Sequence, residues 1–114
     1  MNLTKIDVLE AKENLESSNK IFDELFKHGT LSVEIYTPKV IDKQNPHDKD
    51  EIYVVISGKS DFYFEGETTE VKTGDFLFVP AGKEHRFVSF SEDFTTWAFF
   101  YGPKGGEQND ISIS

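Results

Sequence analysis

Two residues able to bind a metal ion stand four positions apart in the stretch QNPHDKDE, residues 44–51. His47 offers an imidazole and Glu51 a carboxylate, ligands that suit Fe, Mn, Ni, Zn or Cu. The Asn-Pro pair before His47 could begin a helix, which would make the two side chains neighbours at i, i+4. The β-branched run 52–56 that follows argues against a continuing helix.

A strand would also separate His47 from Glu51. On a flat strand they would share a face but lie roughly 13 Å apart, at about 3.3 Å per residue. Two ligands of one ion must each come within about 2 Å of it. Shared coordination therefore requires a bend, for which residues 48–50 (Asp-Lys-Asp) are suited. The simpler interpretation is a loop of solvated charges.

A second stretch, GDFLFVPAGKEH at residues 74–85, adds His85 in the pattern G-x5-P-x-G-x2-H. This pattern resembles the second conserved motif of the cupin family. The pattern H-x3-E-x6-G, from His47 through Glu51 to Gly58, resembles the latter part of the first cupin motif. The two motifs are separated by residues 59–73, a compact spacing similar to that of small single-domain cupins.

The resemblance implies a small antiparallel β-barrel of the double-stranded β-helix, or jelly-roll, type. It also implies one divalent transition metal, whose identity among Fe, Mn, Ni, Zn and Cu stays open. Carried over by position, His47, Glu51 and His85 are the ligands. Two His and one carboxylate can leave coordination positions open for substrate or dioxygen.

The chain departs from the cupin pattern at the first motif histidine, whose place is taken by Asn45. A fourth ligand could be an amide oxygen or water. Asn45 has the parity of His47, whereas Gln44 has the longer reach. Similarity to cupins with a Gln-x-Pro-His stretch favours Gln44, with Asn45 as the alternative. The Asn expected four residues after the last histidine is replaced by Ser89.

Other residues are assigned by parity. Tyr53 and Phe87 share the inward parity of the ligands, and Tyr36 lies on an expected barrel strand, so these three are candidate cavity walls. Tyr53 is also a candidate acid or base. Arg86 has the opposite parity to His85 and is expected at the surface, as is His28 in a turn.

Composition limits the function classes. The chain has 114 residues, no cysteine and a net charge of −9, so disulfides and thiol chemistry are excluded, and nucleic acid and anionic membranes are unfavourable partners. Nine of its 11 Phe residues lie between Phe62 and Phe100, which indicates an aromatic-lined sheet protein. We expect a cytoplasmic protein without a signal peptide.

The expected elements place both motifs on an all-β domain. A short helix is predicted within 1–18, and 21–26 is ambiguous between helix and strand. Strands bounded by Gly and Pro are predicted at 31–37, 52–57, 61–65, 67–72, 75–79, 84–90 and 94–101. The strand at 76–79 is apolar at successive positions and is expected to be buried on both faces. We divide the chain into an N-terminal extension, 1–20, a cupin barrel, 21–103, and a tail, 104–114.

Three functions follow. The first is a metal-dependent cupin enzyme of the dioxygenase or isomerase type, acting on a small neutral or aromatic molecule. Few inward cations are expected, which disfavours phosphorylated sugars. The second is a cupin that binds or senses a small ligand without turnover. The third is a structural barrel that forms a homodimer through its aromatic strands.

Overall fold

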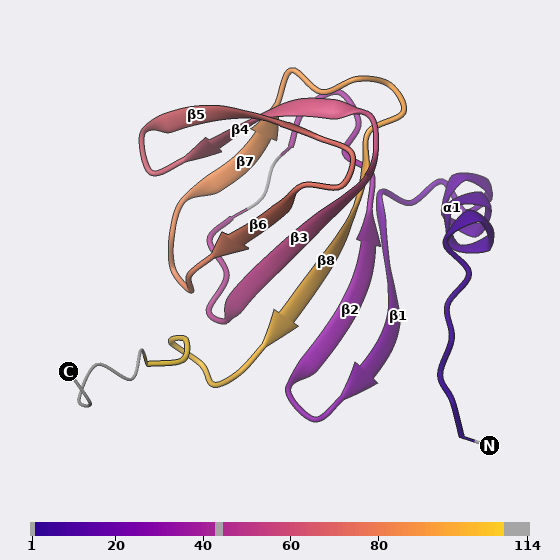
Figure 1. Ribbon diagram of the computed structural model, residues 1–114, viewed down its shortest axis with the longest axis horizontal. Coiled ribbons are helices and arrows are strands. Elements are labelled where there is room, and N and C mark those ends of the chain that lie inside the picture. Colours follow the sequence, from indigo (N-terminus) through magenta and orange to yellow (C-terminus); the bar gives the residue numbers. More distant parts are fainter. Residues whose placement is uncertain (1, 43–44, 109–114) are drawn as a thin grey trace.

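The computed structural model describes residues 2–42 and 45–108, and strands dominate this part of the chain (Figure 1). The prediction of a mainly antiparallel β protein is confirmed. The elements in chain order are α1 (Val8–Ser17), β1 (Phe22–His28), β2 (Leu31–Tyr36), β3 (Asp50–Ser57), β4 (Lys59–Phe64), β5 (Glu67–Lys72), β6 (Phe76–Val79), β7 (His85–Val88) and β8 (Thr95–Tyr101).

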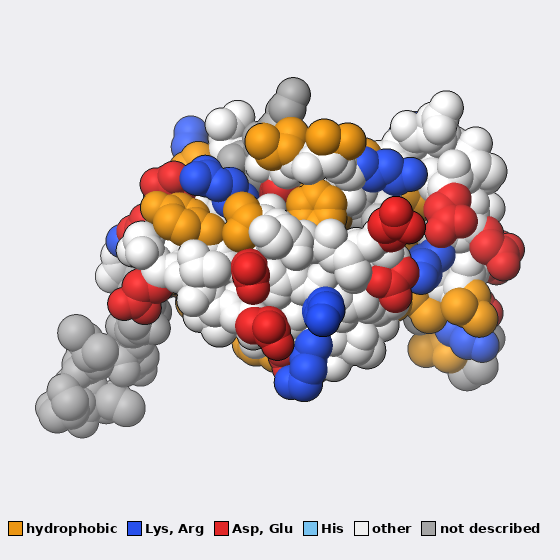
Figure 2. Space-filling view, turned by 90° about the horizontal axis from the view of Figure 1, so that it is seen from above, with side chains coloured by type: hydrophobic (Ala, Val, Ile, Leu, Met, Phe, Trp, Pro, Cys, Tyr) orange, Lys and Arg blue, Asp and Glu red, His pale blue; other side chains and the backbone are white. Residues whose placement is uncertain are grey.

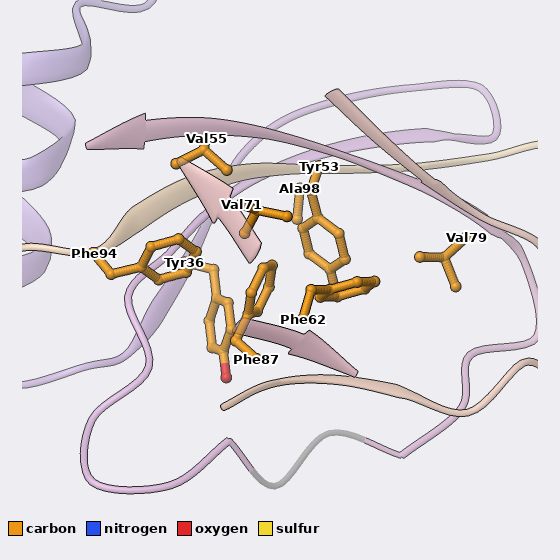
Figure 3. Close-up of a cluster of buried hydrophobic side chains, with 9 residues drawn as sticks. All are labelled: Tyr36, Tyr53, Val55, Phe62, Val71, Val79, Phe87, Phe94 and Ala98. Atoms are coloured by element: carbon orange, nitrogen blue, oxygen red, sulfur yellow. The ribbon is translucent and has the colours of Figure 1, made fainter. Parts of the chain in front are cut away.

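The strands form two antiparallel sheets that face each other. The larger sheet has the order β1-β2-β8-β3-β6 and the smaller one the order β5-β4-β7. Apolar side chains from both inner faces pack between them (Figure 3). This core consists of Tyr36, Tyr53, Val55, Phe62, Val71, Val79, Phe87, Phe94 and Ala98. The ambiguous segment 21–26 contributes to β1, because pairing with β2 decides between helix and strand.

Helix α1 covers part of the outer face of the larger sheet, beside β1 and β2 in Figure 1. Asp7 caps the helix by accepting from the backbone N–H groups of Leu9 and Glu10 at 3.0 and 3.1 Å. Ala11 and Leu15 are buried against Ile35 of β2. Burying Ile35 on this side turns the other face of β2 toward the interior. No helix in the described ranges is long and apolar enough to cross a membrane.

Strand β6 differs from the expectation that it is buried on both faces. Phe76 and Phe78 are 63% and 47% exposed, whereas Val79 is buried. The strand lies at the edge of the larger sheet, and its pairing with β3 places these two rings on the outer face. The successive apolar residues of β6 therefore alternate between a buried face and an exposed face of the sheet in the single chain.

Gly58, the last residue of the first motif pattern, permits a close contact between two turns. Its φ is +77°, and a Cβ there would lie 2.5 Å from Ser91 Oγ and 2.8 Å from Phe94 Cα. We expect Gly58→Ala to lower the free energy of unfolding by about 3 kcal/mol, through backbone strain and this clash. Urea unfolding measures the loss.

Gly66 is the matched control, because its φ is +91° but a Cβ at this position would have no neighbouring atom within 4 Å. Gly66→Ala therefore adds the backbone strain alone, about 1 kcal/mol. Equal losses in the two variants would show that the contact with the turn at 91–94 contributes nothing.

Candidate metal centre and its cavity

Three side chains from separate parts of the chain converge on one point. His47, Glu51 and His85 each offer a ligand atom, and these atoms all lie within 4.8 Å of one another. Glu51 Oε1 is 3.8 Å from His47 Nε2 and 3.1 Å from His85 Nε2. Glu51 and His85 are almost completely buried, at 1% and 2% exposure, while His47 is half-buried at the edge. This is a compact two-histidine, one-carboxylate group.

The chain bends between His47 and Glu51, so the flat-strand separation does not apply. His47 lies in a loop and Glu51 on β3, with the bend at residues 48–49. The backbone of this loop is held from two sides. Gly82 N–H donates to His47 O at 2.7 Å, and Gly105 N–H donates to Asp48 O at 2.6 Å.

Asp50, the residue before Glu51, strengthens this attachment. Its buried carboxylate accepts from Ala81 N–H at 3.0 Å and from Glu107 N–H at 2.8 Å. The turn between β6 and β7 and the segment after β8 are thereby joined to the start of β3. The first residues of the predicted tail thus help to position the site, a role that the sequence did not reveal.

The tautomer of His85 follows from its backbone contact. Its Nδ1 lies 2.8 Å from the carbonyl oxygen of Lys83, which can only accept, so Nδ1 carries hydrogen. When the ring is neutral, its Nε2 lone pair is therefore directed toward the Glu51 carboxylate. Burial alone lowers the pKa of His85, but the Glu51 carboxylate and the Lys83 carbonyl outweigh it, so that the pKa is raised.

The donor atoms of this group fit a cation. Within residues 2–42 and 45–108, both Glu51 oxygens and His85 Nε2 are buried without a hydrogen-bond partner. Buried polar atoms without partners are costly, and two facing acceptors repel unless a proton or a cation lies between them. Imidazole and carboxylate suit a divalent transition metal. His47, Glu51 and His85 are the residues that would hold it.

Among the His, Asp and Glu residues of the described ranges, this group consists of His47, Glu51 and His85 and does not include His28. Gln44 lies outside the described residues. Asn45 is described and is exposed in the loop before His47. His28 is exposed at the end of β1, where its ring stacks on Phe26. Arg86 lies at the surface, with its guanidinium over the Tyr63 ring.

A cavity of about 490 Å³ adjoins the three ligands. Tyr36 and Tyr53 line it, whereas Phe87 lies behind Tyr53, with ring centroids 4.9 Å apart. The remaining wall residues come mainly from β1, β2, β8 and the loop before β3. The lining consists of Ile21, Phe22, Ser32, Glu34, Tyr36, His47, Asp48, Lys49, Glu51, Tyr53, Ala98 and Phe100.

A buried carboxylate fixes the inner wall. Asp42 accepts from the Tyr36 hydroxyl at 2.6 Å and from Phe87 N–H at 2.8 Å. Burial and the neighbouring Asp42 raise the pKa of Tyr36 far above its ordinary value, so its phenol stays protonated as a donor. Asp42 could not be identified from the sequence, because it does not belong to a periodic segment that would indicate where its side chain points.

Glu34 is a second carboxyl that the sequence candidates omitted. It lies half-buried on β2 with the parity of Tyr36, which is the available sequence signal. Burial, followed by the nearby carboxylates of Glu24 and Glu51, raises the pKa of Glu34 to about 6. The cavity therefore holds a carboxyl group that titrates near neutral pH.

This shift makes stability depend on pH. Because the Glu34 pKa rises from 4.5 in the unfolded chain to about 6 in the folded protein, the folded protein binds this proton more tightly. The free energy of unfolding therefore falls as the pH rises from about 4.5 through about 6. We expect Glu34→Gln to remove this loss and to be more stable than the parent above pH 6. Urea unfolding of metal-free protein across this range tests it.

Glu24→Gln provides a graded comparison, because Glu24 is one of the two carboxylates that raise the Glu34 pKa. This variant should retain part of the pH dependence. Stability curves of parent and Glu34→Gln that run parallel between about pH 4.5 and 7 would contradict the prediction.

Comparison with known proteins places the chain in a family. A family model described as a cupin domain matches residues 32–100, and the chain belongs to this family. An uncharacterized protein of Streptomyces coelicolor is 32% identical over 106 residues, covering 91% of this chain and 99% of that protein. The resemblance inferred from the two motifs is confirmed.

Solved structures agree with the cupin jelly-roll fold. A cupin-2 domain protein from Shewanella frigidimarina has a TM-score of 0.67 at 15% identity, covering 85% of this chain and 94% of its own. A candidate mannose-6-phosphate isomerase from Ralstonia eutropha has a TM-score of 0.59 at 26% identity, covering 73% of this chain and 84% of its own.

Proposed function

We propose that this cupin is a metal-dependent enzyme of the dioxygenase or isomerase type, acting on a small organic molecule with a neutral or aromatic body. The observation that carries the proposal is the group of His47, Glu51 and His85, two of them buried, whose ligand atoms converge beside the cavity. A divalent metal supplies Lewis-acid or redox chemistry when it is bound there.

The chain itself supplies binding and orientation. His85 is held by the Lys83 carbonyl, so its Nε2 faces Glu51 without rotation of the ring. The edge of the ligand group is covered by aromatic surface, since the rings of His47 and Phe100 meet edge to face at 4.7 Å. Such a dry wall keeps water away from one side of the site and strengthens electrostatic interactions within it.

Tyr53 is the proposed proton donor or acceptor. Its ring is buried on β3, two residues after Glu51, and its centroid lies 6.0 Å from that of His85. It also lines the cavity, and it is the tyrosine closest in sequence to a ligand of the group. The Tyr36 hydroxyl donates to Asp42 at 2.6 Å.

The cavity does not favour a phosphorylated substrate. A phosphate needs cationic groups, and Lys49 is the one cation in the described lining, against Asp48, Glu34 and Glu51. The similarity to the candidate mannose-6-phosphate isomerase from Ralstonia eutropha therefore does not lead us to propose a phosphosugar substrate for this chain. An aromatic or neutral body is accommodated by Phe22, Tyr36, Tyr53 and Phe100.

Untagged protein tests the proposal by elemental analysis and by turnover of small phenols, diketones and enols. We expect close to one transition metal per chain, lost in His47→Ala and His85→Ala, and turnover that depends on the metal. Lack of metal in the parent would refute the proposed function, and full retention of metal in both variants would refute the ligand set. Metal with ligand binding but no turnover would establish the non-catalytic binding protein instead.

A further inference from the structure

Glu34 lines the cavity beside a small residue on the neighbouring strand. It pairs with Ala98 of β8, and Ala98 pairs in turn with Tyr53 of β3. These three residues lie in one cross-strand row, and all of them line the cavity. Because the alanine side chain is short, the row has an open centre with a carboxyl on one side and a phenol ring on the other.

The Glu34 carboxyl has no hydrogen-bond donor or ion-pair partner among the residues that the structure describes. Ser32, two residues before Glu34 on β2, donates its hydroxyl to Glu24 at 2.8 Å. The one lysine of the lining is also directed elsewhere, with Lys49 Nζ 3.4 Å from Thr30 O. A half-buried carboxyl at a cavity wall thus lacks compensation from its own chain.

The charges of the cavity therefore remain unbalanced. A divalent metal held by His47, Glu51 and His85 would offset Glu51, which is buried and without a hydrogen-bond partner in the described chain. Glu34 lies on a different strand, separated from β3 by β8, and would keep its charge. The net charge of −9 favours cations near the surface as a whole, and the face in Figure 2 carries both acidic and basic side chains.

The remaining walls have the chemistry that recognises an organic cation. Phe22, Tyr36, Tyr53 and Phe100 line the same cavity as Glu34. Aromatic rings attract ammonium groups through the negative charge of their faces, most strongly where water is excluded. A carboxylate in an aromatic cavity selects a positively charged group over a neutral group of the same shape.

We propose that the cavity takes a small amine or quaternary ammonium compound, with its cationic group against Glu34 and an oxygen donor toward His47, Glu51 and His85. This inference rests on the proposed function, because the metal group is the part that would hold the oxygen end. Glu34 is the specificity-determining residue. The proposed ligand thus keeps the neutral or aromatic body expected from the sequence and carries a positive charge at one end.

Isosteric probes test the charge alone. Choline and 3,3-dimethyl-1-butanol have the same shape and hydroxyl group but differ in charge, and tyramine and 4-propylphenol form a second, aromatic pair. We expect the parent to bind the cation of a pair about 10-fold more tightly than its neutral partner, as measured by calorimetry or NMR titration.

Glu34→Gln should bring both ratios close to unity, while Glu24→Gln, which removes a carboxylate already bonded to Ser32, should retain most of the preference. The greater stability expected of Glu34→Gln at neutral pH separates this loss from misfolding. Equal binding within each pair, a preference that survives in Glu34→Gln, or no binding of either cation in the millimolar range would overturn the proposal.

The same titrations with chelator-treated protein separate the two proposals. The charge preference arises from Glu34 and should persist without metal, although the affinity for both members of a pair falls. A cation preference in protein that never holds metal would refute the proposed function alone. Stoichiometric metal with no charge preference would refute the role of Glu34 alone.

Discussion

Glu51→Gln is expected to abolish stoichiometric metal binding and, in metal-free protein, to increase the free energy of unfolding. The carboxylate is buried at 1% exposure between two histidines, and neither of its oxygens has a hydrogen-bond partner in the described chain. An amide of the same shape removes the charge and can donate to His85 Nε2, which lies 3.1 Å from Oε1. We expect a gain of about 1–3 kcal/mol without metal while the His85 ring is neutral, and a smaller gain where His85 is protonated, because the Glu51 carboxylate raises the His85 pKa.

When metal is present, the parent is expected to be more stable than Glu51→Gln. Binding to the folded state adds about 2.7 kcal/mol to the parent at a metal concentration one hundred times the dissociation constant. The variant, which lacks the only anionic ligand of the group, should lose at least about 100-fold in affinity and gain little from added metal. Metal titrations and urea unfolding, each with and without chelator, measure both effects.

Glu70→Gln is the matched control, since Glu70 is exposed on β5 and the chemical change is the same. It should leave both the affinity and the stability near those of the parent. A Glu51→Gln variant that binds metal as the parent does, or that is less stable than the parent without metal, would contradict the account of Glu51 as a metal ligand whose burial costs stability.

Phe87→Ala is expected to lower the free energy of unfolding by about 3–5 kcal/mol, a large part of the roughly 5–15 kcal/mol that stabilises a domain. Phe87 is 1% exposed and lies among four aromatic rings, with centroids between 4.8 and 6.5 Å from its own. These rings belong to Tyr36, Tyr53, Phe62 and Phe94 (Figure 3). Removing the ring leaves a cavity behind Tyr53.

Phe76→Ala deletes the same ring from a position that is 63% exposed, and should cost less than about 1 kcal/mol. Urea unfolding of both variants and the parent provides the comparison. Similar losses in both would show that the core around Phe87 is not the main source of stability. A loss in Phe76→Ala that depends on protein concentration would instead support the homodimer predicted from the aromatic strands.

Much of the fold could be predicted because its signals are local. The turns at Gly58, Gly66 and Gly74 need positive φ, and they separate strands whose observed ends lie within about two residues of those predicted. The segment 21–26 could not be assigned because its apolar residues fit both periods. Its pairing with β2, a contact between separate elements, made it a strand.

The resemblance of two sequence motifs to those of cupins identified His47, Glu51 and His85 as candidates for a metal site, with Gln44 or Asn45 as a possible fourth ligand. The convergence of the first three depended on contacts distant in sequence. The bend at 48–49 is held by Gly82 and Gly105, and no local pattern predicts that these segments meet.

The direction of β2 was likewise decided by tertiary structure. Residues 31–36 alternate in polarity, which indicates a strand but does not identify the face that lines the interior. Helix α1 covers Ile35 on the outer face, and this turns Glu34 and Tyr36 toward the cavity. The sequence alone determined a β strand and a set of metal-ligand candidates, whereas packing of the helix placed a carboxyl group opposite them.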